Sequence, residues 1–358
     1  MTSDLRLLWF NLAVDADSPI QGFNTDWINT LAPYCAFIDV VTMRTGRIAV
    51  ADNVRVFSVG KEKGYSEARR AGEFYRILTG LLAQRHYDAC FAHMQPLFAL
   101  MGAPLLSLRG VPITLWYAHK AVNLRLRLAE QAAFRVVTSS PEGFRIHSPK
   151  VRIVGQGIDT KCFVPGTPPE GEFTILSVSR IAPVKRLETI IETASLLAQD
   201  SRKFRLRIVG STYPHDEWYA QNLRALADAY NLDDVVNFPG EVPHQEIMRE
   251  FQQAHLMVNV SSTGSVDKAV LEAMACGLPV ITANEAFQPI LAPWRDRLLV
   301  PMDAPAELAA KIRSVMRMSD ENRRALGREL RDIVVRDHSL DRLAAVLVEV
   351  FRSGELPT

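Results

Sequence analysis

The sequence contains few cysteines and no long uninterrupted apolar run. Its four cysteines are far apart and form neither a C-x-x-C pair nor a disulfide framework, which excludes a small disulfide-stapled fold. Most of them lie among apolar neighbours, which predicts buried thiols and favours the reducing cytoplasm. The most apolar stretch, Pro96–Tyr117, is broken by glycine, proline and arginine and is therefore not expected to cross a membrane. No apolar core of a signal peptide follows the first residues.

The sequence also has no excess of one charge. Lysine and arginine total 41 against 40 acidic residues, a net charge of +1, so nothing in the overall charge indicates a nucleic-acid partner. Residues 1–160 nevertheless carry an excess of positive charges, and the remaining residues an excess of negative ones. Two interpretations of the basic half stay open: a solvated arginine-rich face, or a surface that meets an anionic acceptor or an anionic membrane.

Several catalytic motifs are missing. The sequence has no G-x-S-x-G elbow and no P-loop, which argues against an α/β-hydrolase and a P-loop nucleotidase. It also lacks a convincing Asp-x-Asp metal motif after a strand. Asp15 and Asp17 have that spacing but belong to the first loop, so we do not expect them to bind a metal.

What is present is the composition of a folded globular protein, with 48% hydrophobic and 23% charged residues. Its 358 residues fit two domains. Short apolar runs alternate with helical patterns, which is typical of βαβ units and a parallel sheet. Strands are expected at 5–12, 37–43, 54–59, 89–92, 113–116 and 135–138, then at 173–178, 205–209, 235–238, 257–260, 279–282 and 298–300. Helices are expected near 25–31, 67–85 and 186–197.

These two sets predict an α/β protein of two Rossmann-like, doubly wound domains facing each other across a cleft. We place the N-terminal domain at 1–162 and the C-terminal domain at 173–335. The remaining residues, 336–358, are expected to form a helix that packs back toward the N-terminal domain. Between the domains, Cys162–Glu172 contains three prolines, which is typical of a linker.

The sharpest polar cluster, Ser177–Arg186, lies between a predicted strand and a predicted helix. Arg180 and Lys185 stand where a helix N-terminus already favours an anion, so a diphosphate is a natural ligand. The alternative is a pair of solvated cations on a loop.

A second cluster, Ser261–Pro279, begins as a loop of small residues and continues as a helix that ends at Gly277. Gly264 permits the backbone to approach a ligand closely. A carboxylate at Glu272 can accept two hydrogen bonds from a ribose diol. Composition alone would equally allow Glu272 to be an ordinary surface residue.

Together these segments resemble glycosyltransferase family 4. The similarity lies in Leu271–Ile281, in the Arg180-x4-Lys185 loop, in Gly155–Phe163 at the domain crossover and in Val137–Ser140. The resemblance implies a GT-B fold and transfer of a hexose, with retention, from a UDP- or GDP-linked sugar. It implies no metal and no further cofactor. It also implies a sugar or lipid-linked acceptor in surface polysaccharide or glycolipid assembly, by a cytoplasmic protein that touches the inner face of the membrane peripherally.

The resemblance also implies roles for single residues. Arg180, Lys185 and His119 would be catalytic. The donor would be bound by Gly22, Gly264, Ser265, Asp267, Lys268, Leu271 and Glu272. The family usually carries two glutamates eight positions apart, and Gly264 stands in place of the first. We therefore expect Asp267 to take over a sugar-hydroxyl contact and Lys268 to add positive charge near the phosphates.

In the N-terminal half, His119 follows a predicted strand where the family often places a histidine directed at the donor sugar. Gly22 resembles the glycine-rich first loop, and His93 also follows a strand. The basic, apolar segment 120–128 is either a partly buried helix or a contact to acceptor or lipid headgroups. Two other functions stay open: a sugar-nucleotide epimerase of the same fold, and a donor-binding subunit that has lost activity.

Overall fold

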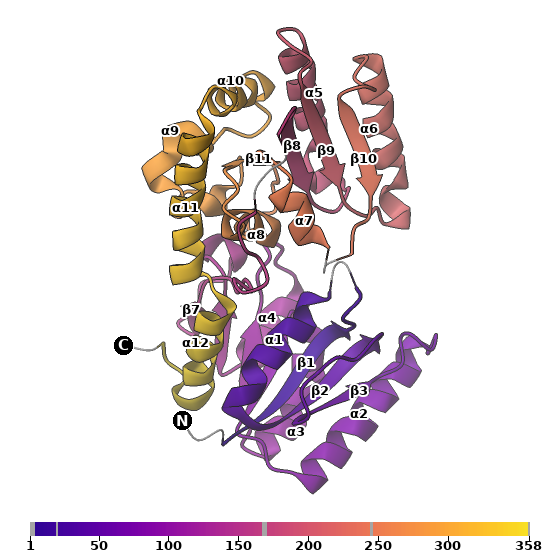
Figure 1. Ribbon diagram of the computed structural model, residues 1–358. Helices are drawn as coiled ribbons and strands as arrows, with labels where there is room; N and C mark the ends of the chain where they lie inside the picture. The colour runs from indigo at the N-terminus through magenta and orange to yellow at the C-terminus, as the bar shows by residue number, and fades with distance from the viewer. Residues whose placement is uncertain (1–3, 19–20, 167–169, 244–245, 357–358) are drawn as a thin grey trace. The chain divides into compact units, whose positions relative to one another are not determined.

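The computed structural model describes residues 4–18, 21–166, 170–243 and 246–356. The chain forms two compact units (Figure 1). Unit 1 comprises Met1–Gly157 together with Leu340–Thr358, and unit 2 comprises Ile158–Ser339. Pro168 and Pro169 of the expected linker lie outside the described residues.

Unit 1 is built around a parallel seven-stranded sheet whose strand order is β3-β2-β1-β4-β5-β6-β7. Its strands are β1 Leu5–Val14, β2 Cys35–Thr45, β3 Val54–Ser58, β4 Ala89–His93, β5 Ile113–Trp116, β6 Arg135–Thr138 and β7 Val151–Ile153. Its helices are α1 Phe23–Leu31, α2 Glu67–Gln84, α3 Pro96–Leu108, α4 Leu124–Ala132 and α12 Leu340–Ser353, with short 3-10 turns η1 Ala32–Tyr34 and η2 Pro141–Gly143. The order reverses between β1 and β4, which is the switch point of a doubly wound sheet.

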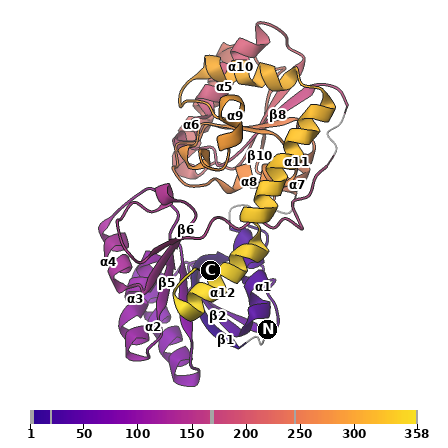
Figure 2. The ribbon, with the colours of Figure 1, turned by 90° about the vertical axis from the view of Figure 1, so that its left-hand side faces the viewer.

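Helix α12 belongs to the core of unit 1, although it follows all of unit 2 in the sequence (Figure 2). Eight of its residues are buried, at helical spacing. They join the core cluster on one face of the sheet, beside α1. At the end of the helix, the ring of Phe351 lies 5.2 Å from that of Phe91 in β4.

Unit 2 has a parallel five-stranded sheet in the order β10-β9-β8-β11-β12. Its strands are β8 Phe173–Val178, β9 Phe204–Val209, β10 Val236–Gly240, β11 Leu256–Asn259 and β12 Val280–Thr282. Its helices are α5 Leu187–Ala198, α6 Glu217–Ala229, α7 Ile247–Gln252, α8 Lys268–Ala275, α9 Arg295–Leu298, α10 Pro305–Met316 and α11 Asp320–Asp337. Four 3-10 turns complete it: η3 Pro183–Lys185, η4 Pro214–Asp216, η5 Glu285–Phe287 and η6 Ala292–Trp294. The order reverses between β8 and β11.

The two sheets confirm the predicted pair of doubly wound α/β domains. One expected strand is wrong: residues 298–300 do not form a strand. Leu298 ends helix α9, and Leu299 makes only an isolated bridge to Thr282. A three-residue apolar run is too short for its period to distinguish a helix end from a strand. Helix α3 lies within the apolar stretch Pro96–Tyr117. In the described part of the chain, no helix is long and apolar enough to cross a membrane.

Three of the four cysteines are buried, and Cys162 is exposed. Burial raises the pKa of Cys35 and of Cys276 to about 12, so both thiols stay protonated near neutral pH. We therefore expect iodoacetamide at pH 8 to modify Cys162 in the native protein and to leave the other three unmodified until denaturant is added. Peptide mass spectrometry measures this, with the fully denatured protein as control. Native modification of Cys90, which is completely buried, would contradict the packing of β4.

Candidate functional site

The predicted polar clusters of unit 2 follow two strands that are neighbours in the sheet. Ser179–Arg186 follows β8, and Ser261–Asp267 follows β11. Because β8 and β11 are parallel and adjacent, their carboxyl ends meet at one edge. The strand order reverses between them, and open α/β sheets bind ligands at that position. The structure thus brings together two segments that are about 80 residues apart in the sequence.

Backbone hydrogen bonds hold the two loops against each other. The Ser262 N–H donates to the Val184 carbonyl over 3.0 Å. In the first loop, η3 ends at Lys185, and Arg186 then takes a left-handed conformation with φ +52°. That turn starts α5 at Leu187.

Lys185 makes the central ion pair of the site. Its Nζ lies 2.7 Å from Asp267 Oδ1 and donates to Ser261 Oγ over 3.3 Å. The Lys185 side chain is only 12% exposed and that of Asp267 13%, so water screens this pair much less than a surface pair. The ammonium is therefore held in a fixed position at the edge of the sheet. Two residues chosen from the sequence, Lys185 and Asp267, contact each other directly.

Asn284, in the loop after β12, was missed by the sequence analysis. It is 1% exposed, and its amide nitrogen donates to the Ser265 carbonyl over 2.8 Å and to Asp267 Oδ2 over 3.0 Å. Its side-chain oxygen accepts from the Ala286 N–H. Asn284 thus fixes the loop that precedes α8. In the sequence, Asn284 is marked only by its position just after β12, the strand next to β11 in the sheet.

Arg180 lies on the other side of the β8 loop. Its guanidinium stands 4.9 Å from the centre of the Tyr213 ring, in cation–π geometry. Gly210 lets the backbone after β9 pass close beneath this loop: it has φ +156°, and a Cβ there would lie 1.7 Å from the Ser179 carbonyl oxygen. Only glycine fits at this contact.

Helix α8 starts directly after the second loop, with Asp267 at its N-cap position and Lys268 as its first residue. Gly264 has φ +66°, a left-handed conformation that favours glycine over a glutamate. Glu272 is 9% exposed, and Leu271 is fully buried in the core.

The N-terminus of α5 is anchored by Tyr219 of α6. The Leu187 N–H donates to the Tyr219 hydroxyl over 2.9 Å, and this hydroxyl donates in turn to Glu188. Burial, together with the hydrogen bond to Glu188, raises the pKa of Tyr219 well above its ordinary value. The hydroxyl therefore stays protonated and keeps the first turn of α5 in place below the β8 loop.

In unit 1, the predicted residues Gly22 and His119 follow β1 and β5, and His93 is the last residue of β4. Gly22 caps α1, and its N–H donates to the Ser18 carbonyl over 2.8 Å. His119 is exposed; its Nδ1 accepts from the Ala121 N–H over 3.0 Å, which leaves the hydrogen of a neutral ring on Nε2. His93 is buried among aromatic rings, with that of Trp27 5.0 Å away.

Buried polar groups without hydrogen bonds gather near the same edge of unit 1. Among the described residues, they include both amide atoms of Asn11 in β1, the hydroxyl of Thr25 in α1 and the hydroxyl of Ser139 after β6. Leaving such a group unsatisfied costs about 1–3 kcal/mol. A ligand or water at this edge would remove that cost, and sequence analysis gave no signal for Asn11.

The two aspartates of the loop after β1 both interact with Arg47. Asp17 pairs with Arg47 over 2.7 Å, which lowers the pKa of its carboxyl, and Asp15 Oδ1 accepts from the Arg47 N–H over 3.2 Å. Across residues 4–18, 21–166, 170–243 and 246–356, no group of three potential ligands could hold a metal ion.

Comparisons with known proteins match part of this chain to a family. Residues 160–332 match the family model described as glycosyl transferases group 1. A putative colanic acid biosynthesis glycosyltransferase, WcaL of Salmonella typhimurium, is 27% identical over 56% of this chain. The chain spans about half (51%) of the length of that relative. A D-inositol 3-phosphate glycosyltransferase of Kineococcus radiotolerans is 27% identical over 69% of the chain and 68% of its own length.

The fold has a solved counterpart over almost the whole chain. The structure of Anabaena Alr3699/HepE in complex with UDP and glucose matches with a TM-score of 0.78 at 17% identity, covering 98% of this chain and 100% of that one. This likeness confirms the predicted GT-B fold, with two Rossmann-like domains. The match of residues 160–332 to the group 1 glycosyl transferase model covers nearly all of unit 2, Ile158–Ser339.

Proposed function

We propose that the chain is a retaining, metal-independent glycosyltransferase that moves a hexose from a nucleotide-diphosphate sugar to an acceptor in surface polysaccharide or glycolipid assembly. The observation that carries this proposal is the pair of loops at the switch point of unit 2, with the partly buried ammonium of Lys185 between them. The names of the relatives, which include glycosyltransferases of colanic acid biosynthesis, support the same activity.

In this proposal, the donor diphosphate lies against Arg180 and Lys185. Both are cations, and charge-assisted hydrogen bonds to phosphate are about twice as strong as neutral ones. As the bond to the sugar breaks, negative charge develops on the leaving diphosphate, and a fixed ammonium stabilises it without reorganising. The two side chains would take the place of a divalent cation, so no metal is required.

The remaining predicted residues would bind and orient the donor. Glu272 would accept hydrogen bonds from the ribose, and the Gly264–Lys268 loop, which includes Ser265, would contact sugar and phosphate. Asp267 engages Lys185 and Asn284, so a contact from Asp267 to a sugar hydroxyl would use lone pairs that these bonds leave open. The backbone of Leu271 would complete this side of the donor site.

Unit 1 would supply the acceptor side. His119 would position the transferred hexose, and the acceptor would enter near Gly22. The unsatisfied amide of Asn11 and hydroxyl of Thr25 supply hydrogen-bonding groups for hydroxylated ligands at this edge. Peripheral membrane contact is part of the proposal: on α4, Leu124 is 70% and Leu128 43% exposed beside basic residues.

A thermal-shift panel of UDP, GDP, ADP and their sugar conjugates tests the proposal. We expect one nucleotide family, UDP or GDP, to raise the melting temperature, because a ligand that binds only the native state stabilises it. Arg180→Ala should abolish the shift, while Arg202→Ala, which removes an exposed arginine before β9, should keep it. Folded protein that responds to no nucleotide would rule out the donor site. Binding with conversion of one sugar nucleotide into another would instead identify an epimerase.

A further inference from the structure

Unit 2 contains a cavity of about 350 Å³ at the opposite edge of its sheet from the proposed donor site. Phe173 begins β8, His255 precedes β11, and Pro279 precedes β12, so the cavity lies at the amino ends of these parallel strands. The first turn of α11 closes one side, and the turn after α8 another. The volume is in the range of small-molecule sites, about 300–1,000 Å³.

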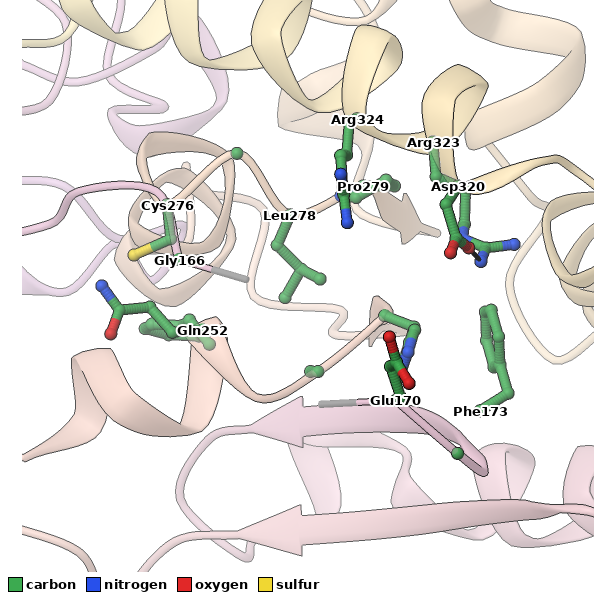
Figure 3. Close-up of a pocket in the computed structure, with 15 residues that line it drawn as sticks. Gly166, Glu170, Phe173, Gln252, Cys276, Leu278, Pro279, Asp320, Arg323 and Arg324 are labelled. Atoms are coloured by element: carbon green, nitrogen blue, oxygen red, sulfur yellow. Dashed lines mark hydrogen bonds and ion pairs between the residues drawn. The ribbon is translucent and has the colours of Figure 1, made fainter. Parts of the chain in front are cut away.

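The floor and one wall of this cavity are apolar and aromatic. Phe173 and His255 stack with ring centroids 5.1 Å apart and planes at 29°. Leu278 points toward the open centre from the turn after α8 (Figure 3). Such walls accept a flat apolar body.

His255 is fixed as a hydrogen-bond donor. Its ring Nδ1 accepts from the Thr174 backbone N–H over 3.1 Å, and the backbone N–H of His255 donates to the Thr174 carbonyl over 2.9 Å. Burial and the nearby charge of Arg323 lower the pKa of His255. The ring is therefore neutral at pH 7, and its hydrogen is on Nε2.

The charged residues that line the cavity differ in the ion pairs and hydrogen bonds that they make. Arg323 pairs with Asp320, donates to the Met318 carbonyl and lies 5.4 Å from the centre of the Phe173 ring. The side chain of Arg324, the next residue, makes no ion pair or hydrogen bond with any residue that the structure describes. Glu170 likewise makes none there. The two stand on opposite walls, both directed toward the open centre (Figure 3).

We propose that this cavity is a second small-molecule site, for a flat apolar compound with a carboxylate at one end and a hydrogen-bond donor at the other. The guanidinium of Arg324 matches a carboxylate in planar, bidentate geometry. Glu170 accepts a hydrogen bond from the polar group at the other end of the compound. Phe173 and Leu278 contact its flat apolar part. The site is separate from the donor loops, and the proposal holds whatever activity the chain has.

The test uses 6-hydroxy-2-naphthoate as probe, titrated into the full chain by isothermal calorimetry. We expect saturable binding of one equivalent. Arg324→Ala should weaken it at least tenfold, and Arg328→Ala should not change it, since Arg328 is an exposed arginine of the same helix outside the cavity. Glu170→Gln should weaken the probe more than it weakens 2-naphthoate, which has no hydroxyl.

Competition locates the site. Saturating UDP and GDP should leave the affinity for the naphthoate unchanged, because the donor loops are at the other edge of the sheet. Displacement by a nucleotide would place the probe in the donor site and overturn the proposal. Equal affinity of wild type and Arg324→Ala, or no saturable binding up to the solubility limit of the probe, would overturn it as well.

Discussion

Lys185→Ala is expected to raise the dissociation constant of the donor's nucleoside diphosphate about 10- to 100-fold. A charge-assisted hydrogen bond contributes about 1.5–3 kcal/mol, and each 1.4 kcal/mol is a factor of ten in affinity. The substitution also leaves the Asp267 carboxylate, which is 13% exposed, without its cation. An uncompensated carboxylate beside the phosphates would repel them.

This second effect makes the prediction specific to the ion pair. Asp267→Asn in the Lys185→Ala background removes the repelling charge, so the double variant should bind the diphosphate more tightly than Lys185→Ala alone. Calorimetric titration of the four proteins gives the coupling energy between the two positions. A double variant that binds no better than the single one would show that Asp267 does not act on the diphosphate.

Arg186→Ala is the matched control, because it removes the neighbouring positive charge. Arg186 turns to the Asp303 carboxylate, from which its Nε lies 2.9 Å away, and not to Asp267. The left-handed backbone conformation at Arg186 costs alanine about as much as arginine, so the substitution adds no backbone strain. We expect its affinity for the diphosphate to stay within about threefold of wild type. If Lys185→Ala has no larger effect than this control, Lys185 does not bind the diphosphate.

The sequence predicts a residue of this site only where a local pattern of residues marks it. Arg180, Lys185 and Asp267 stand in the loops after β8 and β11. Parallel strands bring their carboxyl ends together, so the alternation of strands and helices places both loops at one edge of the sheet. The roles of these residues toward a donor came from the family resemblance. Asn284 could not be found in this way. Its role rests on hydrogen bonds to a loop 17 to 19 residues earlier, and no local pattern marks an asparagine for that task.

The fold shows the same division between local and long-range signals. Strands such as β5 and β6 were predicted with their bounds, because buried central strands are continuous apolar runs between polar residues. Residues 298–300 were misassigned because the same apolar composition ends helix α9. The cavity at the amino end of β8 was not foreseen either: its described walls come from four separate segments, and only the folded chain places Arg324 opposite Glu170.

Phe351→Ala is expected to destabilise unit 1 by about 3–5 kcal/mol, the usual cost of deleting a buried phenylalanine side chain. Phe351 is 5% exposed and packs on Phe91 of the central strand β4. Its loss opens a cavity at the end of α12, where the surrounding sheet cannot collapse to fill it. For a unit of 150–250 residues, each kcal/mol lowers the melting temperature by about 2–4 °C, so we expect a fall on the order of 10 °C.

Hydrogen exchange measured by mass spectrometry locates the effect. Because α12 joins the core cluster of unit 1, amides of β1 and β4 should lose protection in Phe351→Ala, while those of β8 and β9 keep it. Glu349→Gln changes an exposed residue of the same helix and should leave both patterns unchanged. Equal loss of protection in the two sheets would mean that α12 stabilises unit 2 as much as unit 1. In that case, the C-terminal helix would not be an integral element of the unit 1 core, despite its eight buried side chains.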